Sequence, residues 1–387
     1  MAQLNMASAS EALKLFYLPG LQYQLNTANP ILSVIERDST SVVGSEIRMA
    51  LRYGRNGGVG NRADDGILPS PNSRKTKQAK WDTKNIFARI QVSDKTMKAS
   101  RSKDGAFISL LEADLEDAQA DAKDNMARQC FGDGTGTLTV CKANGTATNT
   151  ILVNDVLYLA EGMIVDFTTS GGVVNTSARE ILSVDDVANS ITISGSAITT
   201  GATDLVVVSG SYGLELTGMK AVFTPDNTLY GINRANNKWF NPQIQSAVGS
   251  ISEVAIQKQI DETERKAGGK TNFLMSSYGV RRAYQNLMLA QKRITDVMKL
   301  EGGYEAISYN GIPFVVDKYC PSGSLYGLDL TTWKLYHIED WSWLDSDGSV
   351  LNRVSNQAVW EATLVRYSDI GCSKPKGNFQ MTGITES

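Results

Sequence analysis

The chain has 387 residues, a length that allows two or three compact domains. Its 38 basic and 41 acidic residues give a formal net charge of -3, which argues against a dedicated nucleic-acid-binding protein, because such proteins carry a basic excess. The sequence shows no basic segment followed by an apolar run at its start, and no apolar stretch of the ~20 residues that cross a bilayer, so we expect neither a secretory signal nor a membrane span.

Residues 1–45 have the character of an N-terminal arm. Ser8-Ala9-Ser10-Glu11 fits a capping box, in which a serine and a glutamate cap the first turn of a helix. Pro19-Gly20 ends the short helix that this box would open, and Pro30 interrupts the segment that follows. The arm therefore has little capacity to form a core of its own.

Residues 46–93 predict a long hairpin. Apolar and polar residues alternate over residues 47–53 and again over residues 86–92, which is the pattern of a half-buried strand. The intervening residues 54–84 are rich in Gly, Asn and Pro, and a loop of this length inside a compact domain usually has a function. Its basic residues outnumber its acidic ones: Arg55, Arg62, Arg74, Lys75, Lys77, Lys80 and Lys84 against Asp64, Asp65 and Asp82. We expect a basic limb that reaches another chain; the alternative is plain disorder.

Residues 94–142 contain the strongest predicted helix, from a cap at Asp104 to about Phe131. Its apolar residues keep a period of 3.6 residues, and Gly132-Asp133-Gly134-Thr135-Gly136 predicts its end. The opposite face is strongly acidic, with Glu112, Asp114, Glu116, Asp117, Asp121 and Asp124.

The remaining chain changes character twice. Residues 143–220 are rich in Val, Ile, Thr, Ser and Gly without a helical period, which predicts a small inserted all-β module. Residues 221–370 mix helices and strands: Ser250-Ile251-Ser252-Glu253 fits a capping box for a helix that stops at Gly268-Gly269, and residues 277–293 predict a second helix. Asn310-Gly311 and Asp347-Gly348 predict hairpin turns, residues 359–367 a final strand, and residues 371–387 a tail.

Catalytic, cofactor and metal motifs are missing from the sequence, so we expect no enzyme. His337 is the one histidine, and it lies in a strand-like run without a GxSxG elbow elsewhere. Gly269-Lys270-Thr271 resembles the end of a phosphate loop, but it follows a predicted helix instead of a strand. Asp345-Ser346-Asp347-Gly348 resembles part of a calcium loop with the wrong glycine spacing. The cysteines are scattered and favour free, buried thiols: Cys130, Cys141, Cys320 and Cys372.

The order of these parts resembles the major capsid proteins of tailed bacteriophages, which have the Hong Kong 97-type fold. Three local sequences are also similar to that family: Arg62-Ala63-Asp64-Asp65-Gly66-Ile67-Leu68-Pro69, Gly132-Asp133-Gly134-Thr135-Gly136, and Asn310-Gly311-Ile312-Pro313-Phe314-Val315-Val316-Asp317 with Pro321 and Leu325-Tyr326-Gly327-Leu328-Asp329. The resemblance covers nearly the whole chain and implies an α+β fold with an N-terminal arm, an extended loop, a spine helix in a peripheral domain and an axial domain. The inserted β module departs from the minimal fold.

The resemblance implies a non-enzymatic shell subunit that assembles with itself into pentamers and hexamers of an icosahedral virion, formed in the host cytoplasm. The implied partners are packaged double-stranded DNA contacted without sequence specificity, a portal, decoration proteins, and a separate scaffolding protein, since the spine begins too early for a fused one. No membrane and no cofactor are implied. A Lys–Asn crosslink between subunits occurs in some relatives; lysines lie in the loop here, but nothing identifies the asparagine.

Rings of identical subunits use contacts in which one patch meets a different patch. The basic loop and the acidic helix face are complementary, so we expect the loop of one subunit to lie over the spine of its neighbour. The residues that carry this expectation are Arg62, Arg74, Lys75, Lys77, Lys80, Glu112, Glu116, Asp117, Asp121 and Asp124.

Three alternatives remain open at this point. An encapsulin shell has the same fold but loads enzyme cargo; a hydrolase would have to use His337; and a phage tail or decoration protein would lack the long helix after the loop. Bound cargo, catalytic activity and particle shape respectively distinguish these alternatives from a capsid.

Overall fold

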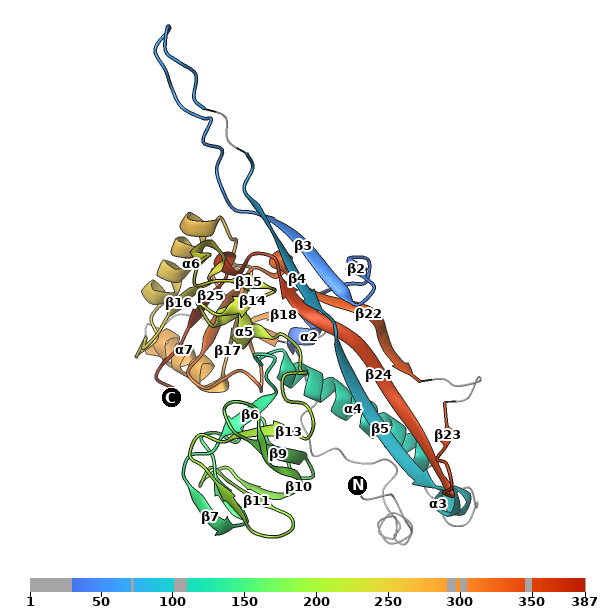
Figure 1. Ribbon diagram of the computed structural model, residues 1–387. Helices are drawn as coiled ribbons and strands as arrows, with labels where there is room; N and C mark the ends of the chain where they lie inside the picture. Colours follow the sequence, from blue (N-terminus) through green and yellow to red (C-terminus); the bar gives the residue numbers. More distant parts are fainter. Residues whose placement is uncertain are drawn as a thin grey trace.

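The computed structural model describes residues 30–70, 73–100, 110–290, 297–299, 305–344 and 350–386. Figure 1 shows a slender hairpin that projects from the top of the body. Below it, an elongated part combines a long helix with long strands, and a second part places helices on a sheet. A small β-rich part lies beside them at the lower left. None of the helices in the described ranges has the length and apolar character needed to cross a membrane.

The elongated part is a helix packed on a sheet. The sheet runs in the order β1 (Glu36–Asp38), β22 (Trp333–Trp343), β24 (Val359–Cys372) and β23 (Asn352–Arg353), and β5 (Lys84–Ser93) pairs with the other edge of β24. Helix α4 (Leu110–Gln129) packs against β5, which continues into α3 (Asp94–Ser100). The alternation in β5 buries Ile86 with Met126 of α4 in one hydrophobic cluster and leaves Phe87 exposed.

The predicted long helix is present but ends earlier than expected. Phe131 N–H donates to Arg128 O at 3.0 Å and Gly132 N–H donates to Gln129 O at 2.9 Å, so the chain tightens into a turn after Gln129. Gly134 and Gly136 follow with φ of 84° and 80°, which confirms the predicted glycine stop. The predicted start near Asp104 lies outside the described residues.

The hairpin uses a different second strand from the one predicted. β3 (Glu46–Arg52) pairs with β4 (Thr76–Asp82), from Glu46–Asp82 at the base to Arg52–Thr76, and the two-residue β2 (Val42–Val43) flanks β3. Residues 86–92, predicted as the partner of β3, belong instead to β5 and pair with β24. The prediction was wrong because β4 has only Ala79 and Trp81 as apolar residues, too few to show an alternating pattern.

Of the predicted arm, residues 1–29 lie outside the described residues. The segment that follows is attached to the body: Ile31 in α2 (Pro30–Val34) is fully buried in the main hydrophobic cluster, and β1 pairs in parallel with β22. The apolar residues of this segment therefore contribute to a shared core instead of forming their own.

The second part of the body, which we call the axial part, is a mixed sheet covered by helices. The sheet order is β16 (Gln243–Gln245), β25 (Phe379–Met381), β21 (Leu325–Leu328), β17 (Phe273–Ser276), β20 (Ile312–Val316), β19 (Glu305–Tyr309) and β18 (Val297–Lys299). Its longer helices are α6 (Glu253–Ala267) and α7 (Tyr278–Ala290), and short elements complete it: α5 (Met219–Phe223), β14 (Thr228–Leu229), β15 (Ile232–Asn233), η1 (Lys238–Phe240), η2 (Leu330–Thr332) and η3 (Pro375–Gly377).

Several local predictions in the axial part are confirmed. Gly268 ends α6 in the left-handed region at φ 60°, so this glycine pair is a helix stop and not a phosphate loop. Asn310 and Gly311, at φ 48° and 79°, form the turn between β19 and β20. The cap of α6 differs by position, because Ser252 and not Ser250 accepts a hydrogen bond from a first-turn amide, that of Ala255, at 3.2 Å.

The β-rich part has its own core. Its larger sheet runs β6 (Thr137–Val140), β13 (Leu205–Val208), β9 (Ile164–Thr168), β10 (Val174–Asp185), β11 (Ser190–Ile193) and β8 (Thr150–Leu152); a separate pair is β7 (Gly145–Thr148) with β12 (Ile198–Thr200). A bridge between Cys141 and Val153 brings the ends of β6 and β8 together, so the larger sheet curls toward closure. Val165, Phe167 and Ile191 are fully buried inside.

Candidate functional site

The residues that could serve catalysis do not gather in one place. His337 lies in β22 opposite Ser368, and its Nδ1 atom is buried without a hydrogen-bond partner. Among the described residues no cluster of His, Cys, Asp and Glu could hold a metal ion. The cysteines are free and buried, as predicted, and burial raises the pKa of Cys372 to about 12, which keeps it a thiol. The calcium-like run at residues 345–348 falls outside the described ranges. The surfaces, rather than a pocket, hold the candidate sites.

The basic residues of the hairpin divide into two groups. Lys77 Nζ donates to Asn237 Oδ1 at 2.8 Å, and Lys80 Nζ lies 2.5 Å from Glu46 Oε1, so both cations of β4 already bind within the chain. Arg62 donates to the carbonyl oxygen of Ile67 at 3.0 Å, which holds the tip in a closed loop. Arg74 and Lys75 are exposed on the outer half. The outer charges are therefore better placed than Lys77 and Lys80 to meet another chain.

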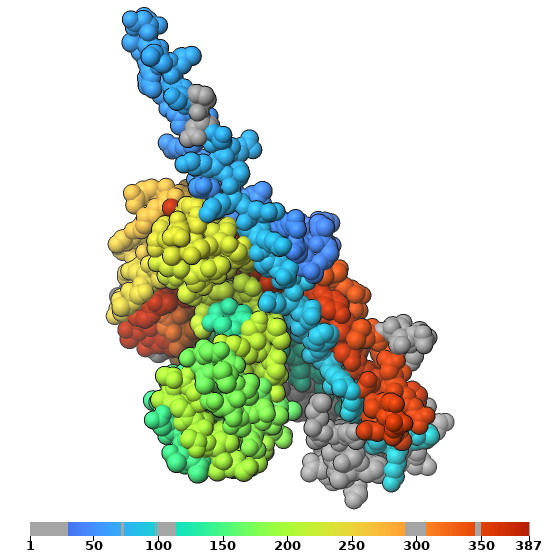
Figure 2. Space-filling model, viewed as in Figure 1, coloured from blue at the N-terminus to red at the C-terminus, as the bar shows by residue number. Residues whose placement is uncertain are grey.

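The tip of the hairpin also carries exposed apolar side chains, which the sequence analysis did not single out. Val59, Ile67 and Leu68 are 83%, 91% and 82% exposed. Figure 2 shows that the hairpin stands clear of the body in this view. Large apolar side chains gathered at a projecting tip are typical of a contact with another molecule.

The acidic face of α4 is only partly available. Glu116 and Asp121 are exposed, whereas Asp124 binds Lys318 and the hydroxyl of Tyr319 within the chain. Partial desolvation, followed by the nearby charge of Asp117, raises the pKa of Asp121. The side chain of Glu112 lies outside the described residues. In Figure 1 the hairpin leads away from α4, so the two charged surfaces of one chain do not face each other.

A groove lies where β5, α4 and the segment returning from the β-rich part meet. It has a volume of about 500 Å³, and its lining includes the exposed Phe87 and Leu214. Beneath it Arg128 Nη2 and Glu215 Oε1 form a buried ion pair at 2.5 Å. Sequence reasoning missed this feature because its walls come from separate segments, and no local pattern connects Phe87 with Leu214.

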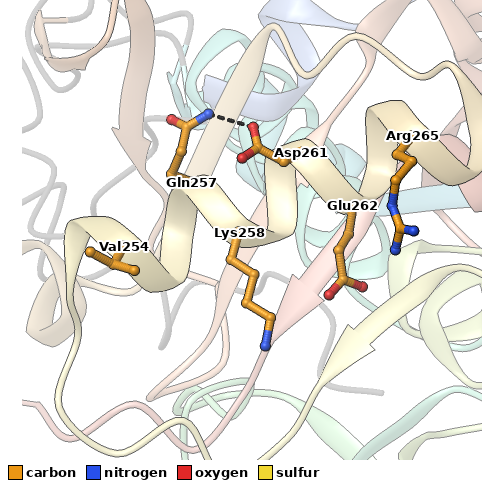
Figure 3. Close-up of a pocket in the computed structure, with 6 residues that line it drawn as sticks. All are labelled: Val254, Gln257, Lys258, Asp261, Glu262 and Arg265. Carbon is orange, nitrogen blue, oxygen red and sulfur yellow. Dashed lines mark hydrogen bonds between the residues drawn. The ribbon is translucent and has the colours of Figure 1, made fainter.

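A second hollow of about 350 Å³ lies along the outer face of α6 (Figure 3). Val254 is exposed at one end, Lys258 and Arg265 line the hollow, and Gln257 Nε2 donates to Asp261 Oδ1 at 2.7 Å. Two basic and two acidic side chains line it from this single helix, which suits a polar contact between proteins better than a small-molecule site.

Two carboxyl groups are buried near the end of α4. Asp369 Oδ1 accepts hydrogen bonds from the amides of Thr217 at 2.7 Å and Ile370 at 2.8 Å, while its Oδ2 has no partner. Burial raises the pKa of Asp369 to about 7 and that of Asp317 to about 6. Asp369 thereby ties the segment that leaves the β-rich part to the long strand β24.

Comparison with known proteins gives a match in structure and none in sequence. No family model matches the chain, and a search of curated proteins finds no similar sequence. A chain of the cyanophage A-1(L) capsid asymmetric unit matches with a TM-score of 0.62 and 12% identity, over 99% of this chain and 100% of that chain. A chain from the capsid of a native GTA particle matches with a TM-score of 0.53 and 9% identity, over 99% and 100% of the two chains.

The chain has the Hong Kong 97-type capsid fold. In the terms of this capsid fold, β3 and β4 build the extended loop and α4 is the spine helix, as the resemblance implied. A chain of the holo-SrpI encapsulin complex from Synechococcus elongatus PCC 7942 also matches, with a TM-score of 0.50 and 7% identity, over 99% of this chain and 96% of that chain. At these identities the likeness establishes the capsid fold alone.

Proposed function

We propose that the chain is the major capsid protein of a tailed bacteriophage, a structural subunit and not an enzyme. It assembles with copies of itself into the icosahedral shell of the virion, around double-stranded DNA. The observation that carries the proposal is the end-to-end match to the phage capsid chain at a TM-score of 0.62. The projecting extended loop supports it, because the apolar side chains at its tip stay largely exposed within the described part of the chain.

The contacts between subunits are proposed to be heterologous, with the extended loop of one subunit lying over the spine region of the next. The basic set Arg62, Arg74, Lys75, Lys77 and Lys80 and the acidic set Glu112, Glu116, Asp117, Asp121 and Asp124 remain the proposed contact residues. Since Lys77, Lys80 and Asp124 bind within the chain, Arg74 and Lys75 on one side and Glu116 and Asp121 on the other are favoured. Closed rings need this arrangement, in which a patch meets a different patch.

The proposal includes the remaining partners and the division of the chain. A separate scaffolding protein, a portal, decoration proteins and DNA bound without sequence specificity are the expected partners, and assembly takes place in the host cytoplasm. The units predicted from the sequence were residues 1–45, 46–93, 94–142, 143–220, 221–370 and 371–387. We propose two changes, because β5 (Lys84–Ser93) pairs with β24 and not within the hairpin, and β25 (Phe379–Met381) pairs with β16 and β21 inside the axial sheet instead of belonging to a tail. The separate hydrophobic cluster that runs from Leu138 to Val206 supports an inserted module, with a start nearer β6 than residue 143.

Electron microscopy of the purified chain tests the proposal, with the chain expressed alone and together with its neighbouring genes. We expect closed, polyhedral shells of uniform size from the co-expressed chain. Isolated monomers in both preparations, at concentrations where related shells form, would contradict the proposal and return attention to His337 and a hydrolase.

An encapsulin-like nanocompartment is the second candidate, favoured by the match to the SrpI encapsulin at a TM-score of 0.50. The contents of the purified shells distinguish the two functions. Packaged DNA in particles from infected cells supports the phage capsid, whereas a co-purifying enzyme bound to the inner wall of DNA-free shells supports the nanocompartment.

A further inference from the structure

The extended loop is held against the axial part at two levels along its length. Near the body, the ring of Trp81 on β4 lies 4.1 Å from the ring of Tyr230, centroid to centroid. Farther out, Tyr53, the residue after β3, stacks on Trp239 with centroids 4.9 Å apart and planes 10° from parallel. Tyr230 and Trp239 both belong to residues 226–241 of the axial part, which we call the cradle.

The inner contact, between Trp81 and Tyr230, involves a tyrosine that hydrogen bonds hold in a strained backbone conformation. Tyr230 has φ 49° and Gly231 has φ 75°, so both lie in the tight turn between β14 and β15. Such a turn favours Asn, Asp or Gly at its first position, and a bulky residue there is strained. Tyr230 is nevertheless 5% exposed, its hydroxyl bridges Ile370 O and Cys372 N, and its carbonyl oxygen accepts from Lys80 N–H at 2.9 Å. A strained residue with this many partners indicates a positional role.

Trp81 is half-buried, and two further elements lie close to its ring. Its ring also meets Tyr336 of β22 edge to face at 5.7 Å. A Cβ atom placed on Gly371 of β24 would lie 2.7 Å from the Trp81 ring and 2.5 Å from that of Tyr336. Three separate elements therefore enclose the base of the loop, and Gly371 is needed for the close approach.

The cradle itself is braced from within, so it can hold the loop without yielding. Arg234 is fully buried and donates to the carbonyl oxygens of Val222 and Ala221 at 2.6 and 2.7 Å. Asp226 accepts from Asn241 Nδ2 at 2.8 Å and pairs with Lys238 at 2.5 Å. The outer contact is lighter, because Tyr53 is 40% exposed and Lys77 adds only the one bond to Asn237.

We propose that the cradle sets the direction in which the extended loop leaves the subunit, with Tyr230 as a permanent anchor and Trp239 as a releasable outer contact. Both are positioning residues: they touch their own chain and act on the neighbour only through the loop. The consequence for assembly rests on the proposed shell function, whereas the hold on the loop is a property of the single subunit. A loop of this length magnifies any change of angle at its base, so the outer contact controls where the tip meets the next subunit.

The direction of the loop is measured on the unassembled full chain with spin labels at Arg55→Cys and Val254→Cys, one past the stack and one on α6. The native cysteines are buried, so the labels attach at the introduced sites. We expect a single narrow distance in the parent, a broad distribution in Trp239→Ala, and recovery in Trp239→Phe, which keeps an aromatic ring. Trp343→Ala, at the far end of β22, is the matched control and keeps the narrow distance.

Hydrogen exchange of backbone amides distinguishes the outer contact, at Trp239, from the inner contact, at Tyr230. In Trp239→Ala the amide of Tyr53, which bonds to Lys75 O at 3.1 Å, should exchange roughly three- to tenfold faster, while that of Lys80 is unchanged. Tyr230→Asn suits the turn better but lacks the ring, so it should speed exchange at Lys80 as well. A narrow distance and parent-like exchange in Trp239→Ala would overturn the proposal.

Shell images of the same variants connect the cradle to assembly. We expect Trp239→Ala to give shells of mixed size or slower assembly, and Trp239→Phe to restore the parent shells. A broadened loop with unchanged shells would overturn the role in assembly and leave the capsid function intact. If the parent forms no shells under any condition, the proposed function fails. The spin-label distances and the hydrogen exchange of the single subunit still test whether the cradle sets the direction of the loop.

Discussion

The β-rich part and the extended loop show two opposite ways of placing apolar residues. Residues 137–208 turn Val165, Phe167 and Ile191 inward, where each is fully buried. The extended loop turns Val59, Ile67 and Leu68 outward at its tip. The first region gains its stability within one chain, because its apolar surface is already removed from water. The second leaves that surface exposed in the subunit, and under the proposed function another copy covers it, so its contribution appears only on assembly.

The strongest test of this contrast removes a core ring from the β-rich part. Phe167→Ala leaves a cavity in a fully buried site, and we expect the free energy of unfolding to fall by about 3–5 kcal/mol. Denaturant unfolding followed by circular dichroism measures it. Val187→Ala, at a 95% exposed position of the same part, should change stability by less than about 0.5 kcal/mol. Equal losses in the two variants would show that the region has no separate core.

Removing apolar side chains from the tip of the extended loop should leave the stability of the subunit unchanged and impair assembly. Ile67→Ser with Leu68→Ser removes apolar surface that is exposed in the subunit, so the unfolding free energy should stay within about 0.5 kcal/mol of the parent. Each loop–neighbour contact should weaken by about 2–4 kcal/mol, which prevents shell formation. Light scattering during assembly gives the measurement. Normal shells from this variant would place the tip outside the interface.

A buried carboxyl group sharpens the contrast, because it should make the free energy of unfolding of the single subunit depend on pH. The pKa of Asp369 is raised by burial to about 7, so the native state binds a proton that the unfolded state releases above pH ~4. The unfolding free energy should therefore fall as pH rises from about 4 to about 7 and level off above. In Asp369→Asn this contribution, up to about 3 kcal/mol between pH 5 and pH 8, should be missing. An identical pH dependence in both proteins would exclude Asp369 as its source.

The smallest expected effect concerns charge on the loop. Arg74→Glu with Lys75→Glu should slow assembly and reduce its dependence on salt, since exposed pairs contribute only ~0–1 kcal/mol each. Lys77 and Lys80 are left in place because both bind within the subunit. Lys142→Glu with Arg353→Glu makes the same change in net charge elsewhere and should leave the assembly rate unchanged. Equal slowing in both variants would indicate a general charge effect.

The sequence revealed features that depend on local periodicity and missed those that depend on distant pairs. The apolar period around Met126 predicted α4, and Asn310-Gly311 predicted its turn, because each signal lies within a few neighbouring residues. β4 was missed because it has only two apolar residues, too few for an alternating pattern. Trp81, one of the two, packs on Tyr230 and Tyr336, which lie far along the chain. Arg128 and Glu215 lie 87 positions apart, so their buried pair could not be read from the sequence.

The proposed charged contact residues show the same difficulty, because their partners are distant in the sequence. Lys77, Lys80 and Asp124 were grouped with exposed charges, because a sequence shows the sign of each charge but not the residue that it binds. The structure assigns them Asn237, Glu46 and Lys318 in their own chain. Which charges stay exposed depends on the packing of the extended loop and α4, and the loop packs on Tyr230 and Trp239, which lie far along the chain.

The two ends of the β-rich part leave the body side by side. Gly213 N–H donates to Thr135 O at 2.8 Å, and a Cβ atom on Gly136 would lie 2.9 Å from Ser211 O. The pair that fastens the returning segment, Arg128 and Glu215, lies outside this junction and on the main-body side. Residues 137–208 thus enter and leave through one junction, and the Tyr158 hydroxyl, which donates to Tyr319 O at 3.0 Å, adds a second attachment that restrains rotation of this part about the junction.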